Sequence, residues 1–109
     1  MSRTFIQLYL TCANTEEADN IAAALLDRRL IGCAKTIPVA SSFRWDGKIN
    51  YDSEILLMMD SAADLFDEVD EEVRLLHSYD VINLQAATSD YVSKQTQGWL
   101  NENLKNGAK

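Results

Sequence analysis

The sequence predicts one α+β domain, residues 1–109, in which two helices cover one face of a four-stranded antiparallel sheet. Three observations support this fold class. Strand-like and helix-like segments follow the order β-α-β-β-α-β, an Asp-Gly pair separates the two central strands, and 109 residues with 47% hydrophobic side chains are enough for one core. Right-handed β-α-β crossovers then give the ferredoxin-like arrangement, with an additional C-terminal helix.

The first strand and helix have the clearest patterns. Residues 4–13 are rich in β-branched and aromatic side chains, and the alternate apolar positions that end at Cys12 share one face. Asn14 stands three residues before Glu17, which is the spacing of a helix-capping box. Apolar residues then recur at helical intervals, and Gly32 suits the C-terminal stop of this helix.

A long hairpin is the next predicted feature. Residues 33–45 and 48–59 are strand-like runs that flank Asp46-Gly47, a strong short-range hairpin signal. Each arm is about twice the usual strand length of about 5 to 6 residues, so the hairpin should project beyond the sheet. Projecting strands invite pairing with another chain, and we expect a homo-oligomer. The alternative is a hairpin that curls over its own core.

The second half of the chain predicts a helix, a strand and a final helix. Ser61 stands three residues before Asp64, and the apolar spacing that follows predicts a helix ending near His77. Residues 81–88 predict the last strand. A C-terminal helix that starts near Asp90 should direct four side chains towards the core: Val92, Trp99, Leu100 and Leu104.

Composition argues against several classes of partner and location. A net charge of −7 repels nucleic-acid backbones and anionic membranes, so neither is an expected partner. The sequence has no apolar run of about 18 residues and no signal-peptide pattern, which predicts a cytoplasmic protein. Cys12 and Cys33 should stay reduced in that compartment, and no disulfide scaffold is expected.

Three stretches of this chain carry a family resemblance. They are "LLDRRLIGCAKTIPVASSFRWDGKINYDSEILLMM", "LLHSYDV" and "GWLNENL", and together they resemble the CutA family of divalent-cation tolerance proteins over nearly the whole chain. The resemblance implies a homotrimer of ferredoxin-like subunits in which the long hairpins complete the sheets of neighbours. It also implies structural kinship with the trimeric PII signalling proteins.

The chain departs from the family pattern after the second helix. Where the family usually has His-Pro-Tyr-Glu-x-Pro-Glu, this chain has Ser78 and Ile82 in place of the prolines and Asn83 in place of the last acidic residue. A pocket that used those groups would be altered here.

The resemblance implies a metal site as well. The family is linked to copper and other divalent metals through cysteine and histidine, which makes Cys12, Cys33 and His77 the candidate ligands. Imidazole and thiolate groups are ligands for Cu(I) and zinc. Their spacing matches no compact ligand motif. The alternative is that His77 only ends a helix and that both cysteines are small buried thiols.

A second candidate site is an effector pocket between subunits. The residues that the resemblance suggests for its lining are Trp45, Glu54, His77 and Tyr79. Arg44 or Lys48 would supply positive charge for a small anionic effector. The alternative for Trp45 is a purely structural role in the hairpin turn and its interface.

Nothing in the sequence predicts catalysis. The chain has no nucleophile elbow, no Gly-rich phosphate loop and no paired zinc motif. We therefore predict a non-enzymatic protein that requires no cofactor and contributes to copper or other metal-ion tolerance through weak metal binding. The alternative is a PII-like signalling or partner-docking module that binds a small effector in the cleft between subunits.

Overall fold

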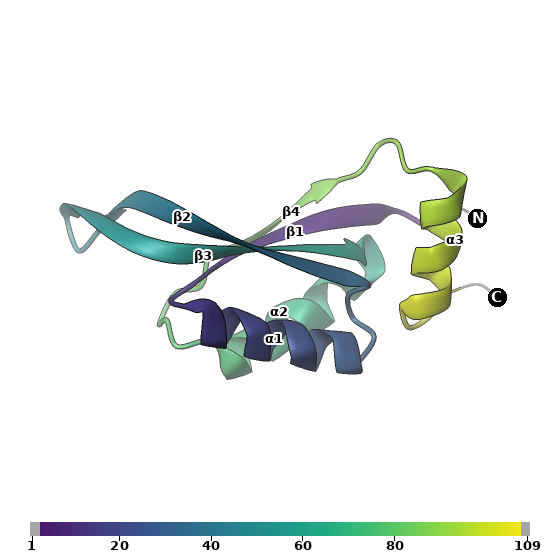
Figure 1. Ribbon diagram of the computed structural model, residues 1–109, viewed down its shortest axis with the longest axis horizontal. Helices are drawn as coiled ribbons and strands as arrows, with labels where there is room; N and C mark the ends of the chain where they lie inside the picture. Colours follow the sequence, from purple (N-terminus) through teal and green to yellow (C-terminus); the bar gives the residue numbers. More distant parts are fainter. Residues whose placement is uncertain (1–2, 108–109) are drawn as a thin grey trace.

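The computed structural model describes residues 3–107 and has the predicted element order (Figure 1). The elements are β1 (Phe5–Cys12), α1 (Thr15–Asp27), β2 (Cys33–Trp45), β3 (Lys48–Ala62), the 3-10 turn η1 (Ala63–Leu65), α2 (Phe66–Leu76), β4 (Leu84–Thr88) and α3 (Lys94–Asn103). The strands form one antiparallel sheet in the order β2-β3-β1-β4. The ferredoxin-like fold is confirmed.

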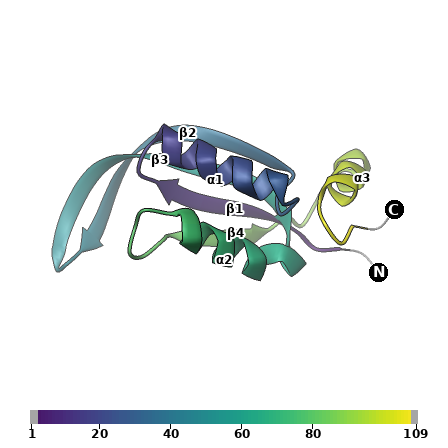
Figure 2. The same cartoon turned by 90° about the horizontal axis from the view of Figure 1, so that it is seen from below.

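The sheet carries its helical layer on one face only. Helices α1 and α2 lie side by side against that face in both views, and α3 lies at the end of the sheet opposite the hairpin tip (Figures 1 and 2). Leu8, Ile21, Leu57, Val69 and Val73 are fully buried between the two layers. Within residues 3–107, no helix combines the length and the apolar character needed to cross a membrane.

The predicted capping box of α1 is present, but Gly32 does not end this helix. The Glu17 amide donates to Asn14 Oδ1 at 2.9 Å. The helix ends at Asp27, and Arg29 adopts the left-handed conformation with φ 59° just beyond it. Gly32 instead makes room for α3, because a Cβ at this position would lie 2.7 Å from Leu100 Cδ2.

The prediction that Ser61 caps the second helix is wrong. Strand β3 continues to Ala62, and α2 begins after η1 without a side-chain cap. Ser61 is fully buried and its hydroxyl donates to the Leu30 carbonyl at 2.7 Å. In a short peptide, a serine hydroxyl often hydrogen-bonds to the backbone at the start of a helix. The Ser61 hydroxyl instead bonds to a backbone carbonyl that is distant in the sequence and lies in the core.

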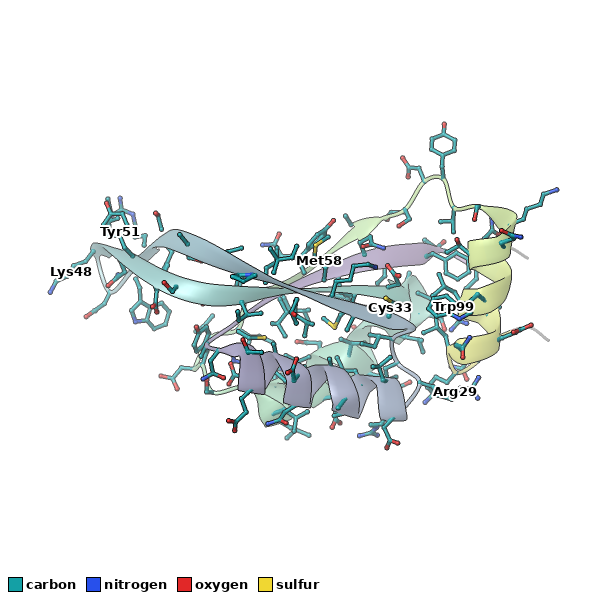
Figure 3. All side chains as sticks on the ribbon, in the orientation of Figure 1. Arg29, Cys33, Lys48, Tyr51, Met58 and Trp99 are labelled. Carbon is teal, nitrogen blue, oxygen red and sulfur yellow. The ribbon has the colours of Figure 1, made fainter. Side chains whose placement is uncertain are left out.

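The last strand and helix both start later than predicted. Strand β4 begins at Leu84, so the predicted residues 81–83 belong to a loop, and α3 begins at Lys94 after the cap Ser93. Leu100 and Leu104 are buried as predicted. Trp99 also points towards the body of the domain, with its ring beside Gly32, but its side chain remains 43% exposed (Figure 3).

The hairpin projects from the body of the domain, as its length predicts (Figure 1). The molecule measures 48 × 25 × 21 Å. Asp46 and Gly47 have φ values of 52° and 72°, which is the type I′ geometry that Asp-Gly favours. Lys48 and Tyr51 lie near the far end in Figure 3, and Tyr51 is 78% exposed. The tip thus presents large apolar side chains to solvent.

Candidate functional site

His77 lies at the C-terminal end of α2, and both nitrogens of its ring have partners. The ring Nε2 is 2.8 Å from the Thr11 carbonyl oxygen, which can only accept a hydrogen bond. The Tyr79 amide donates to Nδ1 at 3.1 Å. These partners assign the neutral tautomer with the proton on Nε2. The side chain is fully buried. His77 therefore joins the end of β1 to the loop after α2.

Glu17 completes the same junction from the first turn of α1. Its carboxylate accepts hydrogen bonds from the amides of Ala13 and Ser78, each at 2.9 Å, and one oxygen lies 3.6 Å from His77 Nδ1. Burial by itself would raise the pKa of Glu17, but these hydrogen bonds lower it below its ordinary value. The carboxylate thus connects the loop after β1, through Ala13, to the loop after α2, through Ser78.

Cys12 is the third member of this cluster. It is fully buried at the end of β1, and burial, followed by the charges of Glu17 and Glu54, raises the pKa of its thiol to about 12. The ligand atoms of Cys12, Glu17 and His77 lie within 4.8 Å of one another. In a tetrahedral zinc site, bonds of about 2.0 to 2.3 Å place two ligand atoms about 3.3 to 3.8 Å apart. The donors would therefore have to move together by about 1 Å to hold one ion.

Cys33 lies outside this cluster. It pairs with Asp60 on β3, whereas the β3 partner of Cys12 is Ile55. Five positions along a strand correspond to about 16 Å. The Cys33 sulfur is instead 3.5 Å from the Lys35 ammonium. Within a single chain, the structure brings together two of the three predicted ligands and adds Glu17, which the capping-box pattern had assigned only to a helix start.

An open pocket lies on the other side of the His77–Tyr79 ring pair. Its volume is about 670 Å³. The lining comes from the end of β1, the outer half of the hairpin and the loop after α2, namely Thr11, Ser41, Ser42, Phe43, Trp45, Asp52, Glu54, Ser78, Tyr79, Asp80, Val81, Ile82 and Asn83. Three of the four predicted pocket residues line it. The fourth, His77, packs behind Tyr79 with the ring centroids 4.6 Å apart.

The charge of the pocket differs from the prediction. Asp52, Glu54 and Asp80 contribute three carboxyl groups, and none of the lining residues that the structure describes is basic. Arg44 and Lys48, the predicted source of positive charge, are not part of the lining. Within one chain the pocket is therefore acidic.

Tyr79 and Glu54 form the polar floor of the pocket. The Tyr79 hydroxyl donates to Glu54 Oε2 at 2.5 Å. Burial and the neighbouring Glu54 carboxylate raise the pKa of Tyr79, so the phenol keeps its proton at neutral pH. Glu54 is only 7% exposed. The family resemblance had assigned both residues to one pocket, but the hydrogen bond that joins them across 25 positions could not be predicted from the sequence.

Fold and geometry together define a small ferredoxin-like protein with a long projecting hairpin, a buried Cys-Glu-His cluster and an acidic pocket. Residues 6–103 match the family model of the CutA1 divalent ion tolerance protein. The chain belongs to this family, and the resemblance seen in the sequence is confirmed.

Two archaeal relatives and one solved structure match over nearly the whole of both chains. The divalent-cation tolerance protein CutA of Archaeoglobus fulgidus is 32% identical over 97 residues, which is 89% of this chain and 95% of the relative. The CutA of Pyrococcus horikoshii is 33% identical over 92% of this chain and 98% of its own length. The crystal structure of CutA1 from Oryza sativa superposes with a TM-score of 0.92 at 26% identity, covering 96% of this chain and 97% of the other.

The relatives leave two predictions open. The solved Archaeoglobus protein, 31% identical with a TM-score of 0.89 over 91% of this chain and 97% of its own, is described as periplasmic. The cytoplasmic location expected for this chain therefore stays a prediction. The homotrimer stays a prediction as well.

Proposed function

We propose that this protein acts in divalent-cation tolerance or homeostasis, and that it does so by weak, reversible metal binding without catalysing a reaction. Membership of the CutA1 family supports the general role. The observation that carries the proposal is the cluster of Cys12, Glu17 and His77, whose ligand atoms lie within 4.8 Å of one another. A thiol and an imidazole together favour copper or zinc over magnesium or calcium.

The same contacts that build the cluster keep its affinity low. A metal must displace the proton of Cys12, whose pKa is raised to about 12 by burial. To use Nδ1 of His77 it must also displace the Tyr79 amide. Both costs favour weak binding that strengthens as the pH rises. This behaviour suits a protein that buffers excess metal ions.

A titration of the reduced protein with Cu(I) and with Zn²⁺ tests this proposal. Cys12→Ser should abolish binding, and the matched variant Cys33→Ser should leave it unchanged because Cys33 lies outside the cluster. Wild-type affinity should rise by about tenfold for each pH unit between about 6.5 and 8.5, since one proton is released. Equal affinities in the wild type and Cys12→Ser, or dependence on Cys33 alone, would contradict the proposal.

We also propose that the functional unit is a cytoplasmic homotrimer. The exposed aliphatic and aromatic tip of the hairpin supports an assembly in which neighbouring copies cover it: Ile49 is 58% exposed and Tyr51 is 78% exposed. Sedimentation equilibrium should give three times the mass of the chain. Replacing Ile49 and Tyr51 with Ser should shift the protein towards monomers, whereas replacing Tyr91, an exposed residue far from the hairpin, should not.

A second candidate function is that of a PII-like module that binds a small effector. The observation that favours it is the open pocket of about 670 Å³ with a buried carboxylate and two exposed aromatic rings. A thermal-shift screen of the chelator-treated protein with small metabolites tests this function. A compound that raises the melting temperature without metal supports it.

A further inference from the structure

We propose that the pocket beside Tyr79 binds a small organic cation, of the alkylammonium or guanidinium class, rather than an anion. This inference rests on the second candidate function, because it assumes that the pocket binds a ligand. It adds the chemical class of that ligand and the residues that select it. Three properties of the described chain support it: the charge of the pocket, the surroundings of Glu54 and the position of two aromatic rings.

The charge of the lining favours a cation. Asp52, Glu54 and Asp80 all line the pocket, and the part of the lining that the structure describes contains no lysine, arginine or histidine. The whole chain has a net charge of −7, so no surrounding excess of positive charge opposes this local field. A cleft lined by charges of one sign concentrates ligands of the opposite sign.

Glu54 is the carboxylate that lacks a counter-ion. It is 7% exposed, and the Tyr79 hydroxyl is its one side-chain hydrogen-bond partner in the described chain. The ion pairs found among residues 3–107 do not include it. A buried carboxylate is costly unless a positive group or several donors approach it. An ammonium or guanidinium group supplies both charge and donors.

Two aromatic rings indicate an organic cation rather than a bare metal ion. Phe43 and Trp45 line the pocket, and each is between a third and two thirds exposed. Organic cations bind over aromatic faces, best of all over tryptophan. Calcium requires about 6 to 8 oxygen ligands, and magnesium keeps its waters in octahedral geometry. A volume of about 670 Å³ is that of a pocket for an organic molecule.

Calorimetric titration of the chelator-treated protein tests the proposal. The probes are three four-carbon compounds, putrescine, succinate and 1,4-butanediol, together with agmatine as a guanidinium. Putrescine and agmatine should bind, more weakly as salt is added, and succinate and butanediol should not. Glu54→Gln keeps the size of the side chain and an acceptor for Tyr79, and it should weaken amine binding by about tenfold or more. The matched variant Glu71→Gln, on the exposed side of α2, should not change the affinity.

Trp45→Leu provides a second variant with little risk to folding, since Trp45 is 52% exposed. It should weaken amine binding by about two- to fivefold. Binding of succinate in preference to the diamine, or equal amine affinities in the wild type and both variants, overturns the cation proposal but leaves a ligand pocket. Absence of binding by all four probes also overturns the cation proposal, and the thermal-shift screen then decides separately whether the pocket binds any effector. The Cu(I) titration of Cys12→Ser tests the metal-binding proposal separately, and its outcome does not depend on whether the pocket binds amines.

Discussion

Two polar sites lie on opposite sides of the His77–Tyr79 ring pair, and they differ in how completely their groups are satisfied. On the closed side, both nitrogens of His77 and both oxygens of Glu17 have partners within the chain. On the open side, Glu54 has one hydroxyl partner and faces a pocket. The same short loop therefore builds a structural junction on one side and a binding surface on the other. Because the closed cluster is already satisfied, it would bind a metal only weakly, whereas Glu54 has no counter-ion among the described residues and marks the place where a cationic ligand would be stabilised.

The largest effect should come from removing the imidazole of the closed cluster. His77→Ala should destabilise the metal-free protein by about 3 kcal/mol, because it leaves the partly buried Thr11 carbonyl and Tyr79 amide without their ring partners. Chemical unfolding at fixed protein concentration measures the change. The neighbouring Leu75→Ala, at a side chain that is 80% exposed, should cost less than about 0.5 kcal/mol. A His77 effect that appears only in metal-loaded protein would contradict a structural junction.

A charge-removing change in the same cluster should have the next largest effect. Glu17→Gln should lower the free energy of unfolding by about 2 kcal/mol at pH 7. The amides of Ala13 and Ser78 both donate to the carboxylate, and in the variant one of them would face the NH₂ group of the glutamine, which cannot accept. The pKa of Glu17 is lowered in the folded state from 4.5, so its contribution is present above that value and is lost as the pH falls through the folded pKa. The stability difference between variant and wild type should shrink as the pH falls below about 4.

Glu16→Gln is the matched control for the Glu17 variant. Glu16 lies in the same turn of α1 but is exposed and has no side-chain hydrogen bond within the described residues. Its unfolding curve should follow the wild type from pH 7 down to acid. A pH dependence in Glu17→Gln that equals the wild type would show that other carboxylates dominate the acid response.

On the open side, the loss of one hydroxyl should matter less. Tyr79→Phe removes the donor to Glu54 and should destabilise the protein by about 1 kcal/mol, because the carboxylate can still reach water in the pocket. Tyr91→Phe, far from the hairpin and with a side chain that is 98% exposed, should change nothing. Urea unfolding of both variants makes the comparison. A loss as large as that of His77→Ala would mean that the pocket floor is as closed as the cluster.

The smallest effect should come from restoring a proline of the family pattern. Ser78→Pro removes the amide that donates to Glu17, at a cost of about 1 kcal/mol, and restricts the unfolded chain, which offsets roughly that amount. His77, with φ −83° and ψ 144°, already has the extended conformation that precedes proline. We expect stability within about 0.5 kcal/mol of wild type by thermal unfolding. A loss above about 2 kcal/mol would show that the Ser78 amide is essential to the junction.

Local patterns were sufficient for much of the fold. Alternating apolar residues before Cys12, the Asn14 to Glu17 spacing and the Asp46-Gly47 turn all predicted elements that the structure contains. Each depends on neighbours within a few positions, and such preferences act before any tertiary contact forms. Ser61 and Gly32 were misread for the opposite reason. Their partners, Leu30 and Leu100, are 31 and 68 positions away.

The candidate site was only partly predictable. Trp45, Glu54 and Tyr79 line the pocket as the family resemblance suggested, but the acidic character of the lining and the exclusion of Arg44 and Lys48 emerged from the folded hairpin. The structure separates the two cysteine candidates because Cys12 on β1 and Cys33 on β2 pair with distant residues of β3. Sequence spacing carries no information about register across a sheet.

The sequence alone determined the order of strands and helices, the excess length of the hairpin and the family of the chain. These features depend on local periodicity, on turn chemistry and on residue identity. Tertiary structure alone decided that Glu17 joins Cys12 and His77, that Cys33 does not, and that Glu54 is buried beside an acidic pocket. Hydrogen bonds and burial link residues that the chain keeps far apart, and only the packing of the helical layer and the loop after α2 against the sheet brings them together.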